Sequence, residues 1–247
     1  MNSLSSTMAQ PLVSILTPTY NRRAFIPQLI QYVKHQTYPR AMVEWVVLDD
    51  GTDSVWDLLE PHTRGPAPLT IQYIRSDVKL NIGAKRNRLH AAAHGDICVT
   101  MDDDDYYPPE RVAYAVNTLR STRKAICGST SIYMYFTDDG SIWKSGPFGA
   151  NHGTFGTMAY TTQYARTHPC DESVLHAEEI DFTRRYSEPL AQLDPLKVML
   201  VICHNNNTFD KRGLRDPNNS VMTKTGLKLT NFIRSGTHRN FYKGLSM

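Results

Sequence analysis

The sequence has 247 residues, of which 40% are hydrophobic and 21% are charged, and its formal net charge is only +3. This ordinary globular composition excludes a fibrous or wholly disordered chain, and the small net charge argues against a dedicated nucleic-acid binder. No apolar stretch approaches the roughly 18 residues that a membrane-spanning helix needs.

The first residues and the cysteines give two further expectations. Residues 1–10 are polar and Ser-rich and contain no signal-peptide core, so we expect them to be disordered. The four cysteines are widely spaced and form no C-x-x-C pair, which is typical of reduced, mostly buried thiols. We therefore expect a cytoplasmic protein.

Apolar strands and helical patterns alternate over the first half of the chain. The expected strands cover residues 12–17, 43–48, 69–74 and 96–101. The expected helices cover residues 25–33, 55–60, 82–94 and 109–121, and Asn81 is the expected cap of the third. This alternation predicts an α/β protein with a mostly parallel central sheet that is covered by helices.

The second half of the chain follows a different pattern. Residues 125–136 and 141–144 flank the run Thr137-Asp138-Asp139-Gly140, which predicts a small antiparallel hairpin. Residues 145–170 look mostly irregular, and they precede a short helix expected over 177–187 and a last buried strand over 197–203. In the remaining tail we expect only loops and a weak helix near 225–234.

Four consecutive carboxylates, Asp102 to Asp105, follow the fourth expected strand. Like charges repel, so a fold that holds them together usually has a cation nearby, and oxygen-rich clusters suit Mg²⁺ or Mn²⁺. An exposed acidic turn is the plainer explanation of such a run. However, two other strands also end in polar residues, Tyr20-Asn21-Arg22 and Asp49-Asp50, and strand ends of a parallel sheet share one edge. The sequence therefore predicts a ligand site at that edge.

Four motifs in this half of the chain resemble, in order and spacing, those of the family 2 glycosyltransferases of the GT-A fold. They are Pro18-Thr19-Tyr20-Asn21-Arg22, Val47-Leu48-Asp49-Asp50-Gly51-Thr52-Asp53, Gly83-Ala84-Lys85-Arg86-Asn87 and Met101-Asp102-Asp103-Asp104-Asp105-Tyr106-Tyr107-Pro108. The resemblance covers residues 11 to about 120 and continues more loosely through Glu178-Glu179 and His204. It implies a Rossmann-like GT-A fold and the metal-dependent, inverting transfer of a sugar from a nucleotide-diphosphate donor to a hydroxyl acceptor.

On this resemblance we expect one domain over residues 11–247. Residues 11–106 would form its nucleotide-binding half, and residues 107–205 would form its acceptor and catalytic half. Residues 206–247 would form a basic tail or lid. Residues 204–247 hold eight Lys and Arg against two Asp, so this region carries a charge of +6 (8 − 2).

The resemblance implies donor contacts for eight residues in or next to these motifs. They are Thr17, Tyr20, Asn21, Asp49, Arg86, Asn87, Asp102 and Asp103. Tyr20 would stack on the base, where an aromatic face contributes about 1–3 kcal/mol. Asp49 would accept a hydrogen bond from the ring N–H of uracil, so UDP is the expected nucleotide. Arg86 would lie near the base, the ribose or the phosphates, whereas Lys85 is expected to face solvent.

Asp102 and Asp104 match the D-x-D motif of the family. By resemblance, Asp102 would face the ribose and the water shell of the metal, and Asp104 would bind Mn²⁺ or Mg²⁺ directly. His204 would be the remaining protein ligand, because it follows an apolar strand and neutral imidazole binds Mn²⁺. The acidic run is longer than the motif requires, so Asp103 and Asp105 remain alternatives.

A base must take the proton of the acceptor hydroxyl, and the resemblance implies that it lies in an acidic pair at a helix start. Glu179 is our first candidate, and Glu178 and Asp181 are the alternatives. The aromatic residues between 143 and 164 suit sugar rings, so we assign the acceptor to this region, with Trp143, His152 and Phe155 as candidate contacts. The acceptor itself, a glycan or another hydroxyl compound, is not specified by the sequence.

Two other functions stay open at this point. A sugar-phosphate nucleotidyltransferase shares the nucleotide-binding sheet, but it needs a Gly-rich basic loop where this chain has residues 18–21. A catalytically silent nucleotide-sugar or glycan-binding module is the second, although the complete acidic run and the Glu pair argue against it. We expect no nucleic-acid partner and no transmembrane segment. A peripheral contact of the basic tail with an anionic membrane and the oligomeric state are left open.

Overall fold

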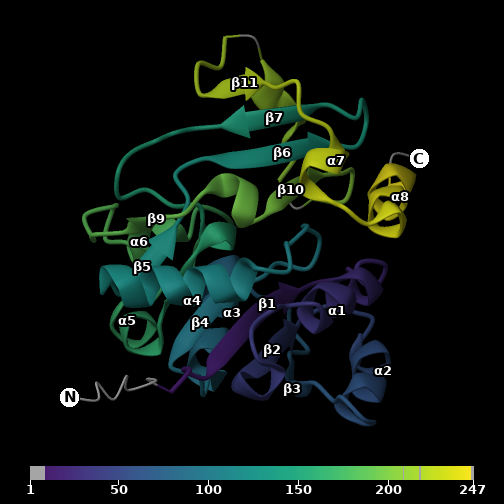
Figure 1. Cartoon of the computed structure of the whole chain (residues 1–247), viewed down its shortest axis with the longest axis vertical. Helices are drawn as coiled ribbons and strands as arrows, with labels where there is room; N and C mark the ends of the chain where they lie inside the picture. The colour runs from purple at the N-terminus through teal and green to yellow at the C-terminus, as the bar shows by residue number, and fades with distance from the viewer. Residues whose placement is uncertain (1–8, 208, 217, 246–247) are drawn as a thin grey trace, which may run out of the picture.

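The computed structural model describes residues 9–207, 209–216 and 218–245. Most of the segment that was predicted to be disordered, residues 1–8, lies outside these ranges. The described chain forms two sheets, a larger one in the lower half of Figure 1 and a smaller one near the top. The larger sheet has the strand order β3 (Thr70–Arg75), β2 (Val43–Asp49), β1 (Val13–Thr19), β4 (Ile97–Thr100), β8 (Ala159–Thr161), β5 (Ile126–Gly128) and β9 (Ala191–Gln192).

The first four strands of this sheet run parallel, as the sequence predicted. Val13 is the register partner of both Val43 in β2 and Ile97 in β4, so the three strands start level. β4 ends opposite Leu16, three residues before the end of β1. Every residue of β1 is buried, which suits a central strand that is covered on both faces. The carboxyl ends of β1, β2 and β4 therefore meet at one edge of the sheet.

Helices surround the larger sheet and continue into the C-terminal region. The α-helices are α1 (Ile26–Lys34), α2 (Trp56–Leu59), α3 (Ile82–Ala92), α4 (Arg111–Thr122), α5 (Thr162–Thr167), α6 (Glu179–Phe182), α7 (Leu229–Phe232) and α8 (Gly236–Gly244). The 3₁₀ turns are η1 (Arg40–Met42), η2 (Glu60–Thr63), η3 (Phe155–Thr157), η4 (Pro195–Lys197) and η5 (Arg212–Arg215). None of the helices in the described part of the chain is long and apolar enough to cross a bilayer.

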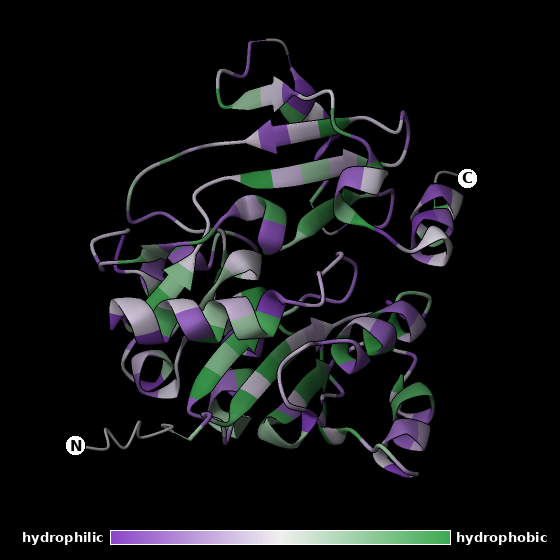
Figure 2. Ribbon diagram, in the orientation of Figure 1, coloured by the Kyte–Doolittle hydropathy of each residue, from purple (hydrophilic) through white to green (hydrophobic). Residues whose placement is uncertain are grey.

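Different helices cover the two faces of the larger sheet. Ile15 belongs to a core that includes Leu29 of α1 and Val112 of α4, whereas its neighbour Leu16 belongs to a core that includes Leu89 of α3. Successive side chains of a strand point to opposite faces, so α1 and α4 cover one face and α3 the other. Figure 2 shows the apolar residues concentrated on the strands between these layers. The predicted helix-covered parallel sheet is confirmed.

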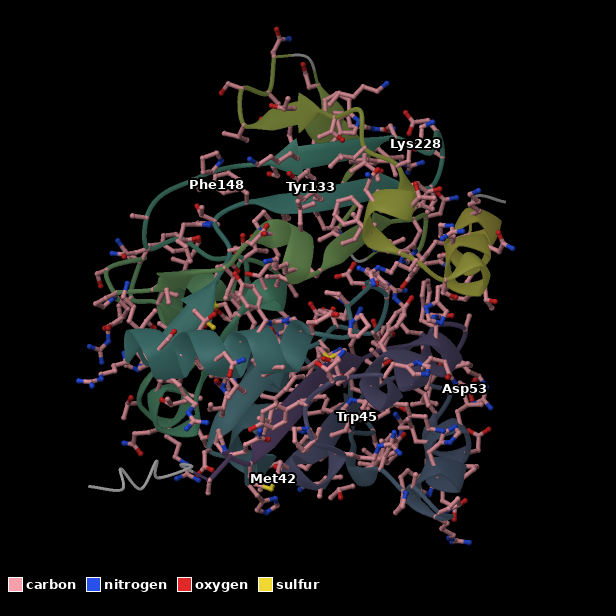
Figure 3. The ribbon with its side chains drawn as sticks, viewed as in Figure 1. Met42, Trp45, Asp53, Tyr133, Phe148 and Lys228 are labelled. Carbon is pink, nitrogen blue, oxygen red and sulfur yellow. The ribbon has the colours of Figure 1, made fainter. Side chains whose placement is uncertain are left out.

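The predicted hairpin is also confirmed, but it belongs to a second sheet. This sheet has the order β10 (Leu200–Cys203), β6 (Ile132–Phe136), β7 (Ile142–Ser145) and β11 (Met222–Lys224). β6 and β7 pair antiparallel around the turn at 137–140, and β10 pairs with β6 in parallel. Tyr133 of β6 contacts the ring of Phe232 in α7, with ring centroids 5.3 Å apart, in the upper part of Figure 3.

Several expected elements differ from those in the structure. The strand expected over 125–136 is divided, because β5 joins the larger sheet and β6 joins the smaller one. The helix expected over 177–187 is only α6, and Arg184, Arg185 and Tyr186, which follow it, all have positive φ angles. The short elements β8, α5, β11 and α8 were not predicted. Cys98, Cys127, Cys170 and Cys203 are buried free thiols, as expected.

Helix α3 also departs from the apolar pattern that was expected for it. Its buried side includes Lys85, Arg86 and His90 in addition to Leu89. Asn81 makes no capping hydrogen bond, because its side-chain amide donates to the carbonyl groups of residues 172 and 173 at 3.2 and 3.4 Å. The start of α3 is therefore fastened to the loop that leads to α6.

We predict that Gly83→Ala destabilises the protein although alanine favours helices. A Cβ atom on Gly83 would lie 1.8 Å from the carbonyl oxygen of Asp171, so α3 and the 171–173 loop would have to separate. The free energy of unfolding in urea should fall by about 1–3 kcal/mol. Gly149→Ala is the matched control, because no atom lies within 4 Å of its added methyl group. Equal stabilities of the two variants would contradict this packing argument.

Candidate functional site

The carboxyl ends of β1, β2 and β4 bring the predicted motifs together. From β1, Arg22 reaches the acidic run, with its Nε atom 3.5 Å from Oδ2 of Asp104. From α3, Lys85 reaches the end of β2, where its Nζ atom lies 2.6 Å from Oδ1 of Asp50. Basic side chains thus alternate with carboxylates along this edge, and each of these pairs joins residues that are far apart in the sequence.

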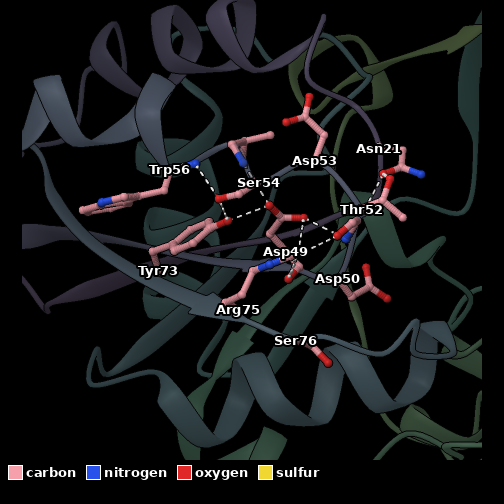
Figure 4. Close-up of polar contacts among 12 residues, drawn as sticks. Asn21, Asp49, Asp50, Thr52, Asp53, Ser54, Trp56, Tyr73, Arg75 and Ser76 are labelled. Atoms are coloured by element: carbon pink, nitrogen blue, oxygen red, sulfur yellow. Dashed lines mark hydrogen bonds and ion pairs between the residues drawn. The ribbon is translucent and has the colours of Figure 1, made fainter.

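Asp49 organises the loop at the end of β2, as Figure 4 shows. Its carboxylate is fully buried and accepts hydrogen bonds from the backbone N–H groups of Gly51 at 2.9 Å and Val55 at 3.0 Å. The hydroxyl of Tyr73 donates to Oδ2 of Asp49 at 2.6 Å, and Arg75 lies 3.3 Å from Oδ1. Burial and the hydrogen bond to Asp49 raise the pKa of Tyr73 to about 12. Asp49 therefore has an internal partner on each oxygen.

Asn21 joins the loop after β1 to the loop after β2 by hydrogen bonds. Its backbone is left-handed, with φ 53°, and its Oδ1 atom accepts hydrogen bonds from the N–H and hydroxyl of Thr52 at 2.7 and 3.1 Å. A Cβ atom on Gly51 would lie 2.7 Å from the Asn21 nitrogen, so only glycine fits there. Thr17 is also internal, because its buried hydroxyl donates to the Met101 carbonyl at 2.7 Å. The contacts of Thr17 and Asn21 are thus within the protein.

The ring of Tyr20 remains partly accessible and has two ammonium groups beside it. The Nζ atoms of Lys79 and Lys85 lie 4.5 and 5.3 Å from the ring centroid. Lys85 is 7% exposed, so the expectation that it faces solvent was wrong. The reason is its ion pair with buried Asp50, which a sequence pattern of helix residues does not reveal. An aromatic face and two cations therefore lie together at this edge.

Arg86 connects the acidic run to the glutamate pair. Its guanidinium group is 3% exposed, and it donates from Nη1 to Asp102 Oδ1 at 2.8 Å and from Nε to Glu178 Oε1 at 3.0 Å. The ring of Phe155 lies beneath it, 4.5 Å from the guanidinium carbon. Burial lowers the pKa of Arg86, but the charges of Asp102 and Glu178 outweigh this effect and raise it. Arg86 is therefore a permanent buried cation.

Asn87 fixes the loop that carries this glutamate pair. Its side-chain amide donates to the Cys170 carbonyl at 2.9 Å, and its Oδ1 atom accepts the Cys170 N–H at 2.9 Å. These two reciprocal hydrogen bonds pair the Asn87 amide with the backbone of Cys170 as a neighbouring strand would. The loop before α6 is thereby held against α3, as it is by Asn81.

The three acidic residues around α6 have different surroundings. Glu178 is 6% exposed and bound to Arg86, whereas Asp181 is exposed to solvent. The Glu179 side chain accepts no hydrogen bond from any other described residue. Burial and the neighbouring charge of Glu178 raise the pKa of Glu179 to about 7. Glu179 is thus a carboxylate that can exchange a proton near neutral pH.

The carboxylates of the acidic run are also distinct from one another. Oδ2 of Asp104 lies 3.2 Å from Nε2 of His204 and 3.2 Å from Nδ2 of Asn207. Burial raises the pKa of Asp104. The hydrogen bond from His204 and nearby positive charges lower it by more, so the pKa lies below its usual value. Burial and the charge of Asp104 instead raise the pKa values of Asp103 and Asp105 well above the usual range. This contrast favours Asp104 as the ionised member.

The chemistry of these side chains fits a divalent cation. Asp104 and His204 bring an oxygen and a nitrogen donor within 3.2 Å, which is a combination that Mn²⁺ accepts. No group of three or more His, Cys, Asp or Glu side chains in metal-binding proximity is found in the described ranges. A cation held by this pair would therefore take further oxygen ligands from bound phosphates or water.

The residues that were assigned to the acceptor are not brought together as predicted. Phe155 is only 2% exposed and packs beneath Arg86, so the prediction that it offers a surface for a sugar ring was wrong. Trp143 lies on β7 of the smaller sheet, where its Nε1 atom donates to Ser141 at 3.0 Å. The ring of His152 lies 4.7 Å from the rings of both Phe148 and Tyr186. His152 and exposed Phe148 thus form a separate aromatic cluster.

Comparison with known proteins gives a family match over most of the chain. The model of the family described as Glycosyl transferase family 2 matches residues 14–178. The putative colanic acid biosynthesis glycosyl transferase WcaA of Escherichia coli K12 is 32% identical over 103 residues, which is 42% of this chain and 36% of that protein. Poly(ribitol-phosphate) β-N-acetylglucosaminyltransferase TarS of Staphylococcus aureus Mu50 is 30% identical over 98 residues, 39% of this chain and 17% of TarS.

Solved structures of glycosyltransferases share the fold. S. aureus TarS 1–349 in complex with UDP-GlcNAc superposes with a TM-score of 0.63 and 18% identity, over 79% of this chain and 59% of that one. The mannosyltransferase PcManGT from Pyrobaculum calidifontis, in complex with GDP-Man and Mn²⁺, superposes with a TM-score of 0.65 and 16% identity. This match covers 81% of this chain and 59% of that one. The chain thus spans less than two thirds of each of these relatives, and the likeness shows that the GT-A fold was predicted correctly.

We predict that Glu179→Gln stabilises the protein at pH 8 but not at pH 4.5. The pKa of this carboxyl rises from 4.5 to about 7 on folding, so folding favours its protonated form. The stability that it contributes is complete below pH 4.5 and is lost as the pH rises through 7. A neutral amide avoids this loss, so the free energy of unfolding at pH 8 should rise by about 1–3 kcal/mol.

Urea unfolding at both pH values measures this difference, and exposed Asp181→Asn is the matched control. A Glu179→Gln effect of the same size at both pH values would show that the burial of charge is not its cause.

Proposed function

The chain belongs to glycosyl transferase family 2, and on this premise we propose that it is a metal-dependent, inverting enzyme that transfers a sugar from a UDP-linked donor to a hydroxyl acceptor. One observation carries the proposal. Arg86 binds Asp102 of the acidic run with one nitrogen and Glu178 with another, so donor-side and base-side carboxylates lie within the span of one side chain.

The donor would lie along the edge where β1, β2 and β4 end. The Tyr20 ring offers a face to the base, and Lys79 and Lys85 place positive charge beside it, where it would attract the diphosphate. Asp49 supports uracil as the base, provided that the uracil N–H replaces one of its internal donors. The relatives differ in their nucleotides, since TarS is solved with UDP-GlcNAc and PcManGT with GDP-Man. UDP is therefore a proposal that rests on Asp49 and on TarS.

Asp104 and His204 would hold the divalent cation, and Asp102 would face the ribose and the water shell of the cation. A bound Mn²⁺ or Mg²⁺ would stabilise the negative charge of the departing nucleoside diphosphate. Arg22, 3.5 Å from Asp104, adds a further positive charge to this region. The lowered pKa of Asp104 supports this choice of ligand over Asp103 and Asp105, both of which favour the protonated state.

Glu179 would take the proton of the acceptor hydroxyl as that oxygen attacks the anomeric carbon. A pKa of about 7 suits a group that must be ionised before the reaction and protonated after it. Glu178 would keep the charge of Arg86 in place, and its own charge would raise the basicity of Glu179. Attack from the side opposite the leaving diphosphate inverts the anomeric carbon in a single displacement.

We predict a selective, Mn²⁺-dependent rise in melting temperature with UDP in a screen of UDP, GDP, CDP and dTDP. Asp104→Asn should remove the Mn²⁺-dependent part of the rise, because it removes the charged metal ligand. Asp57→Asn, which changes an exposed aspartate on α2, is the matched control and should behave as the parent protein.

A preference for GDP or dTDP would refute the role of Asp49 and leave the transfer function in place. The absence of any shift with any nucleotide would contradict the proposed function and favour a silent glycan-binding module.

We also predict that kcat/KM rises with pH along an acidic limb whose midpoint is near 7. The base is active only when it is deprotonated, so activity follows the ionised fraction of Glu179. Glu179→Gln should lower kcat by about 10²–10⁴. Asp181→Asn should retain most of the activity, because its carboxyl lies in solvent. Loss of activity in Asp181→Asn together with an active Glu179→Gln would move the base to Asp181.

A further inference from the structure

A groove of about 880 Å³ lies between α4 and the C-terminal segment that contains α7 and α8. Its lining includes the loop of Tyr106 to Pro109, which follows the acidic run. None of its described lining residues is one of the carboxylates Asp102 to Asp105 or one of the glutamates of α6. The groove is therefore a separate site from the one described above, although residues 106–109 of its lining directly follow the acidic run in the sequence.

One helix face and one irregular segment form the walls. Glu110, Ala113, Tyr114 and Asn117 line the groove at the spacing i, i+3, i+4 and i+7, so they share one side at the start of α4. Residues 230–235, which run from α7 to the start of α8, also line the groove. Two segments more than a hundred residues apart thus build one concave surface.

Hydrogen bonds and ring contacts fix the tyrosines that line the groove. The hydroxyl of Tyr32 lies 2.8 Å from that of Tyr242, and this contact ties α1 to α8. The ring of Tyr106 meets the ring of Tyr32 edge-on at 5.2 Å. The hydroxyl of Tyr114 accepts the N–H of Asp194 at 3.0 Å, so the orientation of this ring is also set. Tyr32 and Tyr106 are only 3% and 7% exposed, so they support the groove from within. Half-buried Tyr114 presents an accessible aromatic face whose orientation is already set before binding.

The charged groups that line the groove are mostly positive. Lys197 and Arg234 are exposed, and no carboxylate of the described residues lies within 4.0 Å of either. His35 and His238 also line the groove, and Glu110 is the one acidic residue among its described lining. The Nζ atom of Lys197 lies 5.7 Å from the Tyr114 ring centroid, so a cation and an aromatic face adjoin one another. Lys197 and Arg234 can therefore form ion pairs with an anionic ligand in the groove.

We propose that this groove binds an anionic oligosaccharide. The accessible face of Tyr114 suits the face of a sugar, and Asn117, Thr230 and Ser235 supply amide and hydroxyl groups for sugar hydroxyls. Lys197 and Arg234 would pair with the carboxylates or phosphates of such a chain. An acyl chain would leave these polar groups unpaired, and an extended peptide would find no strand edge in the lining.

This inference rests on the proposed function in one respect. The saccharide would be a distal part of the acceptor, bound away from the transfer site. Tyr107 gives a physical link between the two places, because it lines the groove and its hydroxyl accepts the backbone N–H of Asp102 at 2.6 Å. Occupation of the groove would thus hold the acceptor chain on the protein near the loop that carries the acidic run.

Direct binding of three probes tests the inference on the whole chain. The probes are a hexameric oligogalacturonate, neutral maltohexaose and a hexaglutamate peptide, measured by isothermal titration calorimetry at low salt. We expect the oligogalacturonate to bind at least tenfold more tightly than either of the others. Maltohexaose that binds equally well would overturn the role of charge, and hexaglutamate that binds equally well would overturn the saccharide assignment. Failure of all three probes to bind would also overturn the inference.

Variants locate the binding to the groove. Arg234→Glu should weaken oligogalacturonate binding about three- to tenfold, and Ala113→Trp should weaken it at least as much by filling the groove without a change of charge. Arg120→Glu makes the same charge reversal on α4 outside the groove and should leave the affinity unchanged. Equal affinities in all variants would overturn the inference.

Melting shifts with UDP and Mn²⁺ separate this inference from the proposed function. The groove variants should keep the nucleotide shift of the parent protein. Nucleotide binding without glycan binding would overturn only the groove, whereas glycan binding without nucleotide binding would overturn only the transfer function.

Discussion

The buried guanidinium of Arg86 is the interaction on which the rest of the site depends. A lone cation with 3% exposure would be strongly unfavourable, and it is stable here because Asp102 and Glu178 both accept hydrogen bonds from it. The buried carboxylate of Glu178 would in turn be destabilised without the arginine. Removing one member of such a group commonly costs about 3–5 kcal/mol. The geometry between the acidic run and the glutamate pair is therefore maintained by charge as well as by packing.

Four carboxyl groups near this network have shifted pKa values, namely those of Asp103, Asp104, Asp105 and Glu179. Asp104, beside His204, keeps its charge, whereas Asp103 and Asp105 favour protonation because burial and the charge of Asp104 disfavour two more anions. Around α6, Glu178 is held by Arg86 and its charge raises the pKa of Glu179. Groups of one chemical type thus acquire different properties from their neighbours. A metal ligand must stay ionised and a base must exchange a proton, and the surroundings of Asp104 and Glu179 give their carboxyl groups these different pKa values.

The loops at the sheet edge are rigid because their polar groups are paired within the protein. Asp49 and Asn21 accept backbone hydrogen bonds across the β1 and β2 loops, and Gly51 permits their close approach. Such pairing leaves the Tyr20 ring and the ammonium group of Lys79 as accessible features of this edge. The motif residues therefore divide into those that build the edge and those that present chemistry to a ligand.

The sequence by itself determined the parallel half of the fold and the family, because continuous apolar runs specify buried strands and the four motifs lie at strand ends or helix starts. It could also place Asp102, Asp104 and His204 after their strands. It could not show that Lys85 and Phe155 are buried, that β5 leaves the hairpin for the larger sheet, or that Arg86 joins Asp102 to Glu178. These features depend on contacts between residues up to 92 positions apart, and local propensity carries no information about such partners. Only the tertiary structure decided which carboxylate keeps its charge and where the groove beside α4 lies, because burial and electrostatic interaction are set by neighbours in space.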